Sequence, residues 1–375
     1  MTEPSLAGLY ITDGRIFGIV GSDEIASIPK REISELSLSI PTSDPTKKPT
    51  VFLFSKKKPI EETFDAACAW IAKAAPNVRS IGVGCYGPFR NINPEDRDKA
   101  SSDYGYLQAT SHGELSNRNL VGIVRKGLAK HLTHSPRISI NMDVALDAMG
   151  LIYNKSRNKA LWESAQENTI ALLRIDRGIG GSFMRMRDAY SWLGALHPEV
   201  GQINVQRWEP TSGTVSRQEA KREASGHVSG VMNKNSVEGL ASIPAIERWF
   251  DESFATLKSN PSHIAWEREA WYLAQLSWAI TCVVSPSKIY LCGEIMTVNG
   301  LHEKIVQAFS KIKETPSFPS YAALEDVDTY LESLTTVDTK GQLRSLKPGV
   351  TGSLCAAALA VQGIAQVKSM KTITG

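Results

Sequence analysis

The sequence predicts an α/β protein that contains two related lobes. Strand hairpins followed by helical patterns occur twice, once near residue 10 and again near residue 170, and this alternation is typical of α/β architectures. The chain has 375 residues, of which 42% are hydrophobic, so it can bury a large core and form two domains. A glycine cluster at 178–181 interrupts the second hairpin, and backbone amides there can approach a ligand without a Cβ in the way.

Local patterns define the individual elements. In 8–21 two apolar runs flank Asp13 and Gly14, a pair that tolerates positive φ angles, so a tight hairpin is expected. Asn117 can cap a helix that extends to Leu132 with its apolar residues on one face. Periodicity predicts further helices at 61–75, 238–250, 266–284 and 352–365, and apolar runs predict strands at 80–87, 137–141 and 288–292.

Composition and charge argue against several classes of function. The net charge is +3 with no long basic run, so neither nucleic acid nor a membrane surface is an expected partner. Residues 1–22 lack the features of a signal peptide, and no apolar stretch reaches transmembrane length. Five scattered cysteines without a C-x-x-C pair are typical of a reducing compartment. We therefore expect a cytoplasmic protein.

Seven stretches spread over nearly the whole chain indicate a more specific relationship. Each would be a weak signal alone, but together they resemble the ROK family (repressor, open reading frame, kinase), and especially its fructokinase-like branch. The stretches are I-G-V-G-C-Y-G-P (81–88), Y-G-Y-L-Q-A-T (104–110), M-D-V-A-L-D-A-M-G (142–150), G-I-G-G (178–181), H-P-E-V-G (197–201), V-E-G-L-A-S-I-P-A-I-E (237–247) and S-P-S-K-I-Y-L-C-G (285–293).

The resemblance implies a two-lobe α/β fold of the actin-like and hexokinase-like type, related to ribonuclease H, with the ligands in a cleft between the lobes. On this basis we expect a smaller N-terminal lobe at 1–137, onto which a C-terminal helix at 352–375 packs back, and a larger lobe at 138–351. Members of the family are commonly dimers. The resemblance therefore also suggests a homodimer, with which the apolar helix at 266–284 is compatible, although a buried core role explains that helix better.

The family's sugar-binding side is largely retained. Asp143 matches the catalytic aspartate, the base that takes a proton from the sugar hydroxyl, and capping of the helix behind it is a simpler role compatible with the first. Glu199 and Glu238 match carboxylates that bind sugar hydroxyls, although either could be a surface charge or a first-turn helix charge. The expected substrate-binding residues are Gly87, Pro88, His197, Glu199 and Glu238.

The nucleotide-binding side departs from the family pattern at the first phosphate hairpin. Where the family reads acidic-Ala-Gly-Gly-Thr-Lys, this chain reads Y-I-T-D-G-R over 10–15. Tyr10 thus replaces the acid that helps to hold Mg²⁺, and Asp13 replaces a glycine with a charge that repels phosphate. The altered loop consists of Thr12, Asp13, Gly14 and Arg15.

Two later nucleotide motifs change in the same direction. The second phosphate loop reads D-R-G-I-G-G-S over 176–182, and the family's late G-G-G-V motif reads C-G-E-I over 292–295, so each contains an added acid. Phosphoryl transfer depends on positioning and on charge neutralisation, so we expect these changes to impair nucleotide binding, although Arg177 could bind phosphate or pair with Asp176. In these two motifs Asp176 and Arg177 are altered positions of the second phosphate loop, and the retained glycines are Gly178, Gly180 and Gly293.

Many family members also hold a structural zinc ion through one histidine and a later cluster of cysteine and histidine. The four equivalent positions in this chain are Gln202, Gly230, Asn233 and Ser236. None of them supplies the nitrogen and sulfur ligands that tetrahedral zinc takes. The resemblance therefore predicts that the zinc site has been lost, and no other metal site is predicted.

Three functions are compatible with this sequence. The first is a repurposed enzyme in which a small polar molecule occupies the former sugar site and Asp143 acts as general base, with Glu199 or Glu238, in ATP-independent acid–base chemistry. The second is an active sugar or polyol kinase that uses ATP and Mg²⁺ through altered phosphate loops. The third is a non-catalytic binding or regulatory protein. The retained substrate side next to an altered nucleotide side favours the first function, which needs no cofactor.

Overall fold

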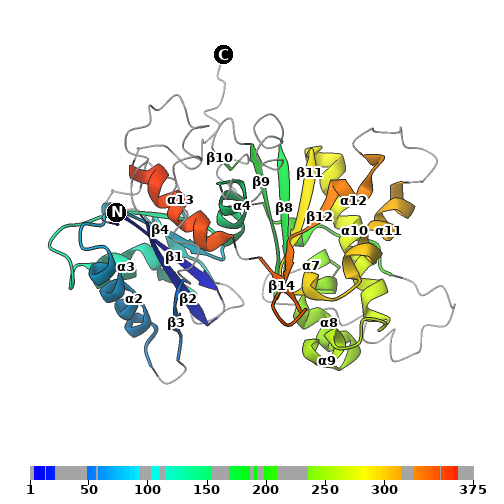
Figure 1. The fold of residues 1–375 in the computed structure, drawn as a ribbon, viewed down its shortest axis with the longest axis horizontal. Helices are drawn as coiled ribbons and strands as arrows, with labels where there is room; N and C mark the ends of the chain where they lie inside the picture. The colour runs from blue at the N-terminus through cyan, green and yellow to red at the C-terminus, as the bar shows by residue number, and fades with distance from the viewer. Residues whose placement is uncertain are drawn as a thin grey trace, which may run out of the picture. The chain divides into compact units, whose positions relative to one another are not determined.

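The chain forms two compact units (Figure 1). Unit 1 comprises Met1–Asn168, Phe183–His197 and Lys347–Gly375, and unit 2 comprises Thr169–Ser182 and Pro198–Leu346. The computed structural model describes residues 4–12, 14–21, 49–55, 58–92, 96, 103–109, 115–153, 169–185, 190–191, 198–208, 235–313, 324–346 and 348–361.

Unit 1 contains a five-stranded mixed sheet whose strand order is β3-β2-β1-β4-β7. The first two strands form the antiparallel hairpin that the sequence predicts, with Thr12 opposite Arg15 and Gly14 at a φ of 69°. The next strands along the sheet, β4 and β7, run parallel to β1. The strands are β1 (Leu6–Thr12), β2 (Arg15–Gly21), β3 (Thr50–Leu53), β4 (Ser80–Cys85) and β7 (Arg137–Met142), and a separate short pair is formed by β5 (Tyr106–Leu107) and β6 (Arg118–Asn119).

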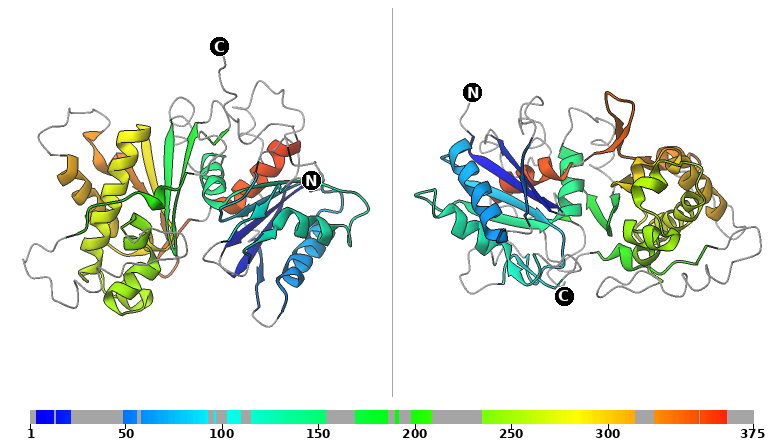
Figure 2. Two further views of the ribbon diagram at one scale, coloured as in Figure 1. Left: turned by 180° about the vertical axis from the view of Figure 1, so that it is seen from behind. Right: turned by 90° about the horizontal axis from the view of Figure 1, so that it is seen from below.

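Side chains alternate between the two faces of this sheet, and each face is covered by a pair of helices (Figure 2). Apolar residues such as Leu9 and Val83 form one core with α2 (Ile60–Ala74) and α3 (Leu120–Leu128). The other face is covered by α4 (Asp143–Tyr153) and α13 (Gly349–Val361).

Glycines allow the second pair of helices to approach closely. A Cβ at Gly82 of β4 would lie 1.8 Å from the carbonyl oxygen of Ser353 on α13, and one at Gly352 of α13 would lie 1.9 Å from the carbonyl oxygen of Leu146 on α4. The small-residue helix predicted at 352–365 is therefore confirmed as α13, three residues earlier than expected. Because α13 packs on α4 and β7 pairs with β4, both β7 and α4 lie in unit 1, beyond the lobe limit expected at residue 137.

A second mixed sheet has the strand order β10-β9-β8-β11-β12, and its strands β8, β11 and β12 and residues 179–182 of β9 belong to unit 2. Strands β8, β11 and β12 are parallel. The strands are β8 (Ile170–Ile175), β9 (Ile179–Arg185), β10 (Tyr190–Ser191), β11 (Lys288–Cys292) and β12 (Leu331–Ser333), and a separate hairpin is formed by β13 (Thr335–Val337) and β14 (Leu343–Ser345).

The helices of unit 2 are dominated by one long, largely buried helix, α10 (Ala265–Val284), which confirms the helix predicted at 266–284. It packs against α11 and α7. The remaining helices are η5 (Val200–Gln202), α7 (Val237–Ala241), α8 (Ile243–Phe250), α9 (Phe254–Lys258), η6 (Ile295–Thr297), α11 (Leu301–Lys313) and α12 (Val327–Tyr330). No helix in the described residues is long and apolar enough to cross a membrane.

Two predicted helices differ from the structure in their limits. The cap of α3 is Asn119, whose Oδ1 accepts a hydrogen bond from Gly122 N at 2.7 Å, whereas Asn117 has a left-handed φ of 57°. The helix predicted at 238–250 is divided into α7 and α8, because Ser242 has extended backbone angles and Pro244 follows it in the first turn of α8. Proline fits that position because its missing N–H would have no partner within the helix.

Unit 2 buries a carboxyl group in α10. Glu269 is fully buried, and within the described residues neither of its oxygens has a hydrogen-bond partner. This burial raises the pKa of the Glu269 carboxyl well above its ordinary value of 4.5, and the neighbouring charge of Arg268 offsets only part of that shift.

We expect E269Q to remove a pH dependence of stability. Since folding raises this pKa, the native fold is favoured most below the unfolded-state value of 4.5 and loses stability as the pH rises toward the folded-state value. Relative to the native chain, the free energy of unfolding of E269Q should rise by up to about 1.4 kcal/mol per pH unit between pH 4.5 and the folded-state pKa, and the difference should stay constant above that pKa. Urea unfolding at several pH values measures this difference.

The matched control is E267Q on the same helix, since Glu267 is half-exposed and pairs with Lys304. It should follow the pH dependence of the native chain. An E269Q variant whose unfolding free energy varies with pH like that of the native chain would contradict the interpretation.

Candidate active site

The carboxyl ends of β4 and β7 bring together three of the predicted site residues in unit 1. These parallel strands are paired in register, with Cys85 opposite Met142, so the Gly87–Pro88 turn and Asp143 emerge at the same edge of the sheet. A Cβ at Gly87 would lie 2.4 Å from the terminal methyl group of Met142, so the glycine leaves room for that side chain.

Neighbouring segments hold this edge in place. Gln108 N donates a hydrogen bond to the carbonyl oxygen of Pro88 at 2.9 Å. Ile140 N, on the edge strand β7, donates to the hydroxyl of the buried Tyr104 at 3.0 Å. The buried Tyr104 therefore helps to hold the sheet edge through its hydroxyl group.

Asp143 is the first residue of α4, and its side chain is half-buried. Its Oδ1 accepts a hydrogen bond from the next amide, Val144 N, at 2.9 Å, and so satisfies one of the first N–H groups of the helix, which have no partner within it. The capping role and the role of general base are thus compatible in the structure. A half-buried carboxylate can still reach a substrate hydroxyl.

Tyr10 forms a hydrogen-bonded network with a second aspartate of α4. The Tyr10 side chain is 1% exposed, and its hydroxyl donates to Oδ2 of the buried Asp147 at 2.9 Å. Gly349 N, at the start of α13, donates to the other oxygen, Oδ1, at 2.8 Å. A Cβ at Gly349 would lie 2.1 Å from the Tyr10 ring, so only glycine fits beside this tyrosine.

This network occupies the position that the family resemblance assigns to the Mg²⁺-binding acid. A tyrosine hydroxyl that donates to a buried carboxylate is not a hard oxygen ligand of the kind Mg²⁺ takes. The rest of the first hairpin loop is at the surface, with Gly14 and Arg15 exposed and Thr12 half-buried, and Asp13 lies outside the described residues. Tyr10 and the residues around it therefore do not fit a metal–phosphate site.

In unit 2, Glu238 joins the glycine loop after β8 to the turn of η5. The residue is buried, with 8% of its surface exposed, and its Oε2 accepts a hydrogen bond from Ile179 N at 2.8 Å. Cβ atoms at Gly178 and Gly201 would lie 3.3 and 3.0 Å from that oxygen, so both glycines let the carboxylate approach. Glu238 thus stabilises the loop and uses at least one of its lone pairs within the chain.

Glu199 lies beside this arrangement at the start of η5. Its carbonyl oxygen accepts from Gln202 N at 2.9 Å, while its side chain is exposed and available to a ligand. Unit 2 therefore brings Gly178, Glu199 and Glu238 into one region. His197, the remaining predicted substrate residue, lies outside the described residues.

The added acids of unit 2 have cationic partners. Asp176 lies 3.5 Å from an Nη atom of Arg174, and Glu294 lies 3.1 Å from Nζ of Lys258, which also donates to Thr297. Arg177 and Gly180 of the same loop are exposed and half-buried, respectively. The charge of each acid is therefore partly neutralised, which weakens the argument that repulsion alone excludes phosphate.

The late glycine motif has a different constraint. Gly293 has a φ of 107°, and a Cβ there would lie 2.0 Å from the carbonyl oxygen of Ile175. Its amide donates to Oγ of Ser345 on β14 at 2.9 Å. The donor that such a loop offers to an anion is therefore already used by a side chain of the same unit.

Sequence reasoning missed the residues that complete these networks, namely Asp147, Lys258, Ser345 and Gly349. Only Asp147 carried a usable signal, because it follows Asp143 by one helical turn on the same face. Within the described residues no group of three histidine, cysteine or carboxylate side chains could hold a metal ion. Of the positions equivalent to zinc ligands, Gly230 and Asn233 lie outside the described residues.

A sequence model of the ROK family matches residues 58–324. The chain is 22% identical over 271 residues to a fructokinase of Streptococcus mutans. The aligned region covers 72% of this chain and 78% of that protein. It is also 22% identical over 246 residues to a fructokinase of Zymomonas mobilis, covering 64% and 70% of the two chains.

Solved structures show the same fold. A ROK hexokinase from Thermus thermophilus superimposes with a TM-score of 0.57 at 14% identity, covering 96% of this chain and 99% of the other. A ROK glucokinase from Streptomyces griseus, in complex with glucose and AMPPNP, has a TM-score of 0.55 at 14% identity with the same coverage. The chain therefore has the actin-like α/β fold that these hexokinases and glucokinases share, as the sequence predicts.

The Tyr10–Asp147 bond should contribute measurably to stability. We expect Y10F to lower the free energy of unfolding by about 1.5–3 kcal/mol, the usual range for a hydrogen bond to a charged group. Thermal and urea unfolding measure this loss. The control is Y106F, because the half-buried Tyr106 contributes its ring, which lies 4.2 Å from the Arg90 guanidinium carbon. Equal stabilities of Y10F and Y106F would contradict the role assigned to the Tyr10 hydroxyl.

Proposed function

This chain belongs to the ROK family of sugar-kinase fold, and from that premise we propose that it acts on a small polar molecule by acid–base chemistry without ATP. In this proposal Asp143 is the general base. Glu199 supplies the second carboxyl group, and Glu238 holds the loop beside it. The observation that carries the proposal is the Tyr10–Asp147–Gly349 network, which takes the place of the family's metal-binding acid.

The hydrogen bonds of unit 2 support the same conclusion. The amide of Ile179 in the second phosphate loop is bound by Glu238, and the amide of Gly293 is bound by Ser345. Anion cradles depend on amides that are free to point at the ligand. Two of those amide donors are thus already hydrogen-bonded to side chains of this chain, and a nucleotide would have to displace these side chains.

The retained carboxylates support a polar substrate with hydroxyl groups. Related proteins have been solved with glucose and AMPPNP, in the Streptomyces griseus glucokinase, and with sucrose, in a ROK protein of Streptococcus pneumoniae. A carboxylate held at a sheet edge can accept a proton from a hydroxyl or from a carbon next to a carbonyl group. Isomerisation, cyclisation, hydration and elimination all need such a base and an acid.

An ATP-dependent sugar kinase is the second candidate, and one observation favours it. The acids Asp176 and Glu294 are paired with Arg174 and Lys258, so unit 2 does not present them as bare negative charges. Arg177 is also exposed in the second phosphate loop. A non-catalytic binding protein of the same fold is the third candidate and would tolerate substitution of Asp143.

Nucleotide binding separates the first two candidates. We expect calorimetry with Mg²⁺ and AMPPNP, with fructose or glucose present, to show no saturable binding at about 1 mM, which corresponds to about −4.1 kcal/mol. The fructokinase of Streptococcus mutans, titrated in parallel, is the control. Micromolar nucleotide binding by this chain together with a phosphorylated sugar product would establish the kinase and refute the proposal.

Proton abstraction by Asp143 can be followed without knowing the product. We expect this chain, incubated in D₂O with a panel of ketoses, aldoses and polyols, to exchange a substrate hydrogen for deuterium, as detected by NMR. D143N should lower that rate by at least about 10²-fold, the lower end of the range for general-base catalysis.

The control for this experiment is D328N, because Asp328 is also an aspartate in the first turn of a helix but is exposed on α12. It should keep the native exchange rate. Exchange that is equally fast in D143N would remove Asp143 from the mechanism, and no exchange with any compound would favour the non-catalytic candidate.

A further inference from the structure

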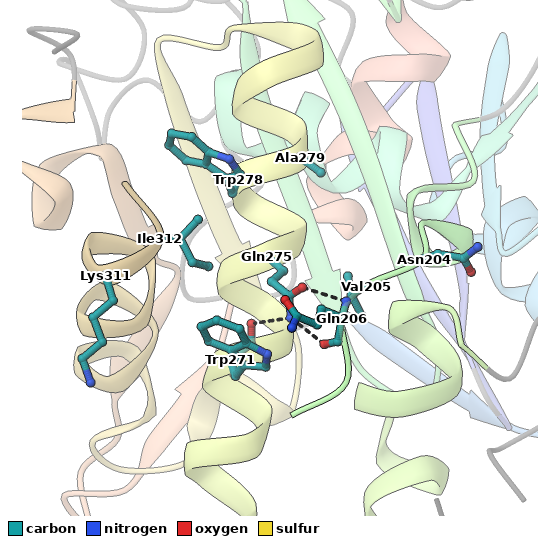
Figure 3. Close-up of a pocket in the computed structure, with 9 residues that line it drawn as sticks. All are labelled: Asn204, Val205, Gln206, Trp271, Gln275, Trp278, Ala279, Lys311 and Ile312. Carbon is teal, nitrogen blue, oxygen red and sulfur yellow. Dashed lines mark hydrogen bonds between the residues drawn. The ribbon is translucent and has the colours of Figure 1, made fainter. Parts of the chain in front are cut away.

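Unit 2 has a pocket whose lining includes none of the candidate active-site residues. It lies between α10, α11 and the extended segment 204–206, and its volume is about 370 Å³ (Figure 3). This size falls within the range of about 300–1,000 Å³ that is typical of small-molecule sites. The lining residues are Asn204, Val205, Gln206, Trp271, Gln275, Trp278, Ala279, Lys311 and Ile312.

One wall of this pocket is fixed by side chains of α10. The amide of Gln275 accepts a hydrogen bond from Gln206 N at 2.8 Å and donates one to Gln206 O at 2.9 Å, as an adjacent strand would (Figure 3). Two residues further along, Trp208 N donates to the hydroxyl of the buried Tyr272 at 3.2 Å. The segment is therefore held to the helix at two points, and the pocket is formed before any ligand binds.

Two half-buried indole rings provide the apolar surface. Trp271 and Trp278 are two helical turns apart on one side of α10, and Ile312 of α11 projects between them (Figure 3). Trp278 is fixed by an edge contact with Phe309, with ring centroids 5.5 Å apart. Rigid aromatic faces of this kind bind flat apolar ligands with little loss of side-chain entropy.

The charge of the pocket favours an anion. Lys311 is exposed at the rim and is the only charged residue among the described residues that line the pocket. Lys304, earlier on the same helix, is paired with Glu267, whereas Lys311 forms no ion pair within the described residues. No acid among the described residues therefore competes with a ligand for the Lys311 ammonium group.

We propose that this pocket binds a small planar aromatic anion, an aryl carboxylate or sulfonate of one or two rings. The rings stack against Trp271 and Trp278, and the acid group pairs with Lys311. The volume of the pocket, its fixed wall and its single positive charge together specify this class of ligand. The inference is independent of the reaction proposed for Asp143.

The probe for this site is 2-naphthalenesulfonate, titrated by calorimetry against the full chain. We expect saturable binding at one site per chain. K311Q should weaken that binding about fivefold, the factor that one close charge pair contributes in water. W271A should weaken it at least about fivefold, the factor that corresponds to the lower end of the range for stacking on an aromatic ring.

Two controls make the result decisive. Lys340, exposed on the turn between β13 and β14, provides K340Q, which should bind like the native chain. The neutral analogue 2-naphthalenemethanol should bind more weakly than the sulfonate and should not respond to K311Q. Because K311Q changes only an exposed side chain, it tests the proposal even where W271A fails to fold.

Three outcomes would overturn the proposal. These are the absence of saturable binding at about 1 mM probe, an affinity equal in the native chain and in K311Q, and a loss of self-association caused by W271A or K311Q alone in sedimentation experiments. The last outcome would make this surface a contact between copies of the chain.

Discussion

The buried carboxylate of Asp147 links three parts of unit 1 that are far apart in the sequence. It accepts hydrogen bonds from Tyr10 on β1 and from Gly349 at the start of α13, while it is itself part of α4. Removing one partner of a buried charge destabilises a protein far more than losing a surface ion pair. Restoring an acid at position 10 would place two carboxylates beside each other in the core. The substitution at this position is therefore coupled to the fold, and it is not an isolated change in a loop.

The same principle applies in unit 2, where glycines permit close contacts that consume hydrogen-bonding capacity. Gly178 and Gly201 allow Glu238 to reach the amide of Ile179, and Gly293 allows its own amide to reach Ser345. In a phosphate-binding loop, glycine is useful because the amide stays free for the anion. Here the conformational freedom of glycine is retained while the donors are used internally. A glycine motif therefore indicates the backbone path more reliably than it indicates the ligand.

This distinction explains what could be predicted from the sequence. The hairpin around Gly14, the helix α10 and the small-residue helix α13 follow from local periodicity and turn chemistry, so they were predicted nearly in full. The cap of α3 was placed on Asn117 and not on Asn119 because both asparagines suit a cap and only the backbone angle separates them. The bond between Tyr10 and Asp147 spans 137 positions, and no local pattern reports a contact of that range. The roles assigned to Asp143 and Glu199 stay predictions, and Asp13 and His197 lie outside the described residues.

Charge counting and hydrogen-bond geometry lead to different conclusions about the nucleotide side. By charge, Asp176 and Glu294 disfavour a triphosphate, yet each lies next to a cation, Arg174 or Lys258, and a paired acid repels far less than a bare one. By geometry, the committed donors of unit 2 and the Tyr10 network of unit 1 disfavour it more strongly, because phosphoryl transfer depends on preorganised donors and a bound metal ion. An ion pair can open at small cost near the surface, whereas the Tyr10 ring can leave its place only if α13 moves away from it. Under the proposed function, packing in unit 1 would therefore set the main constraint on nucleotide binding, and the electrostatics of unit 2 would be secondary to it.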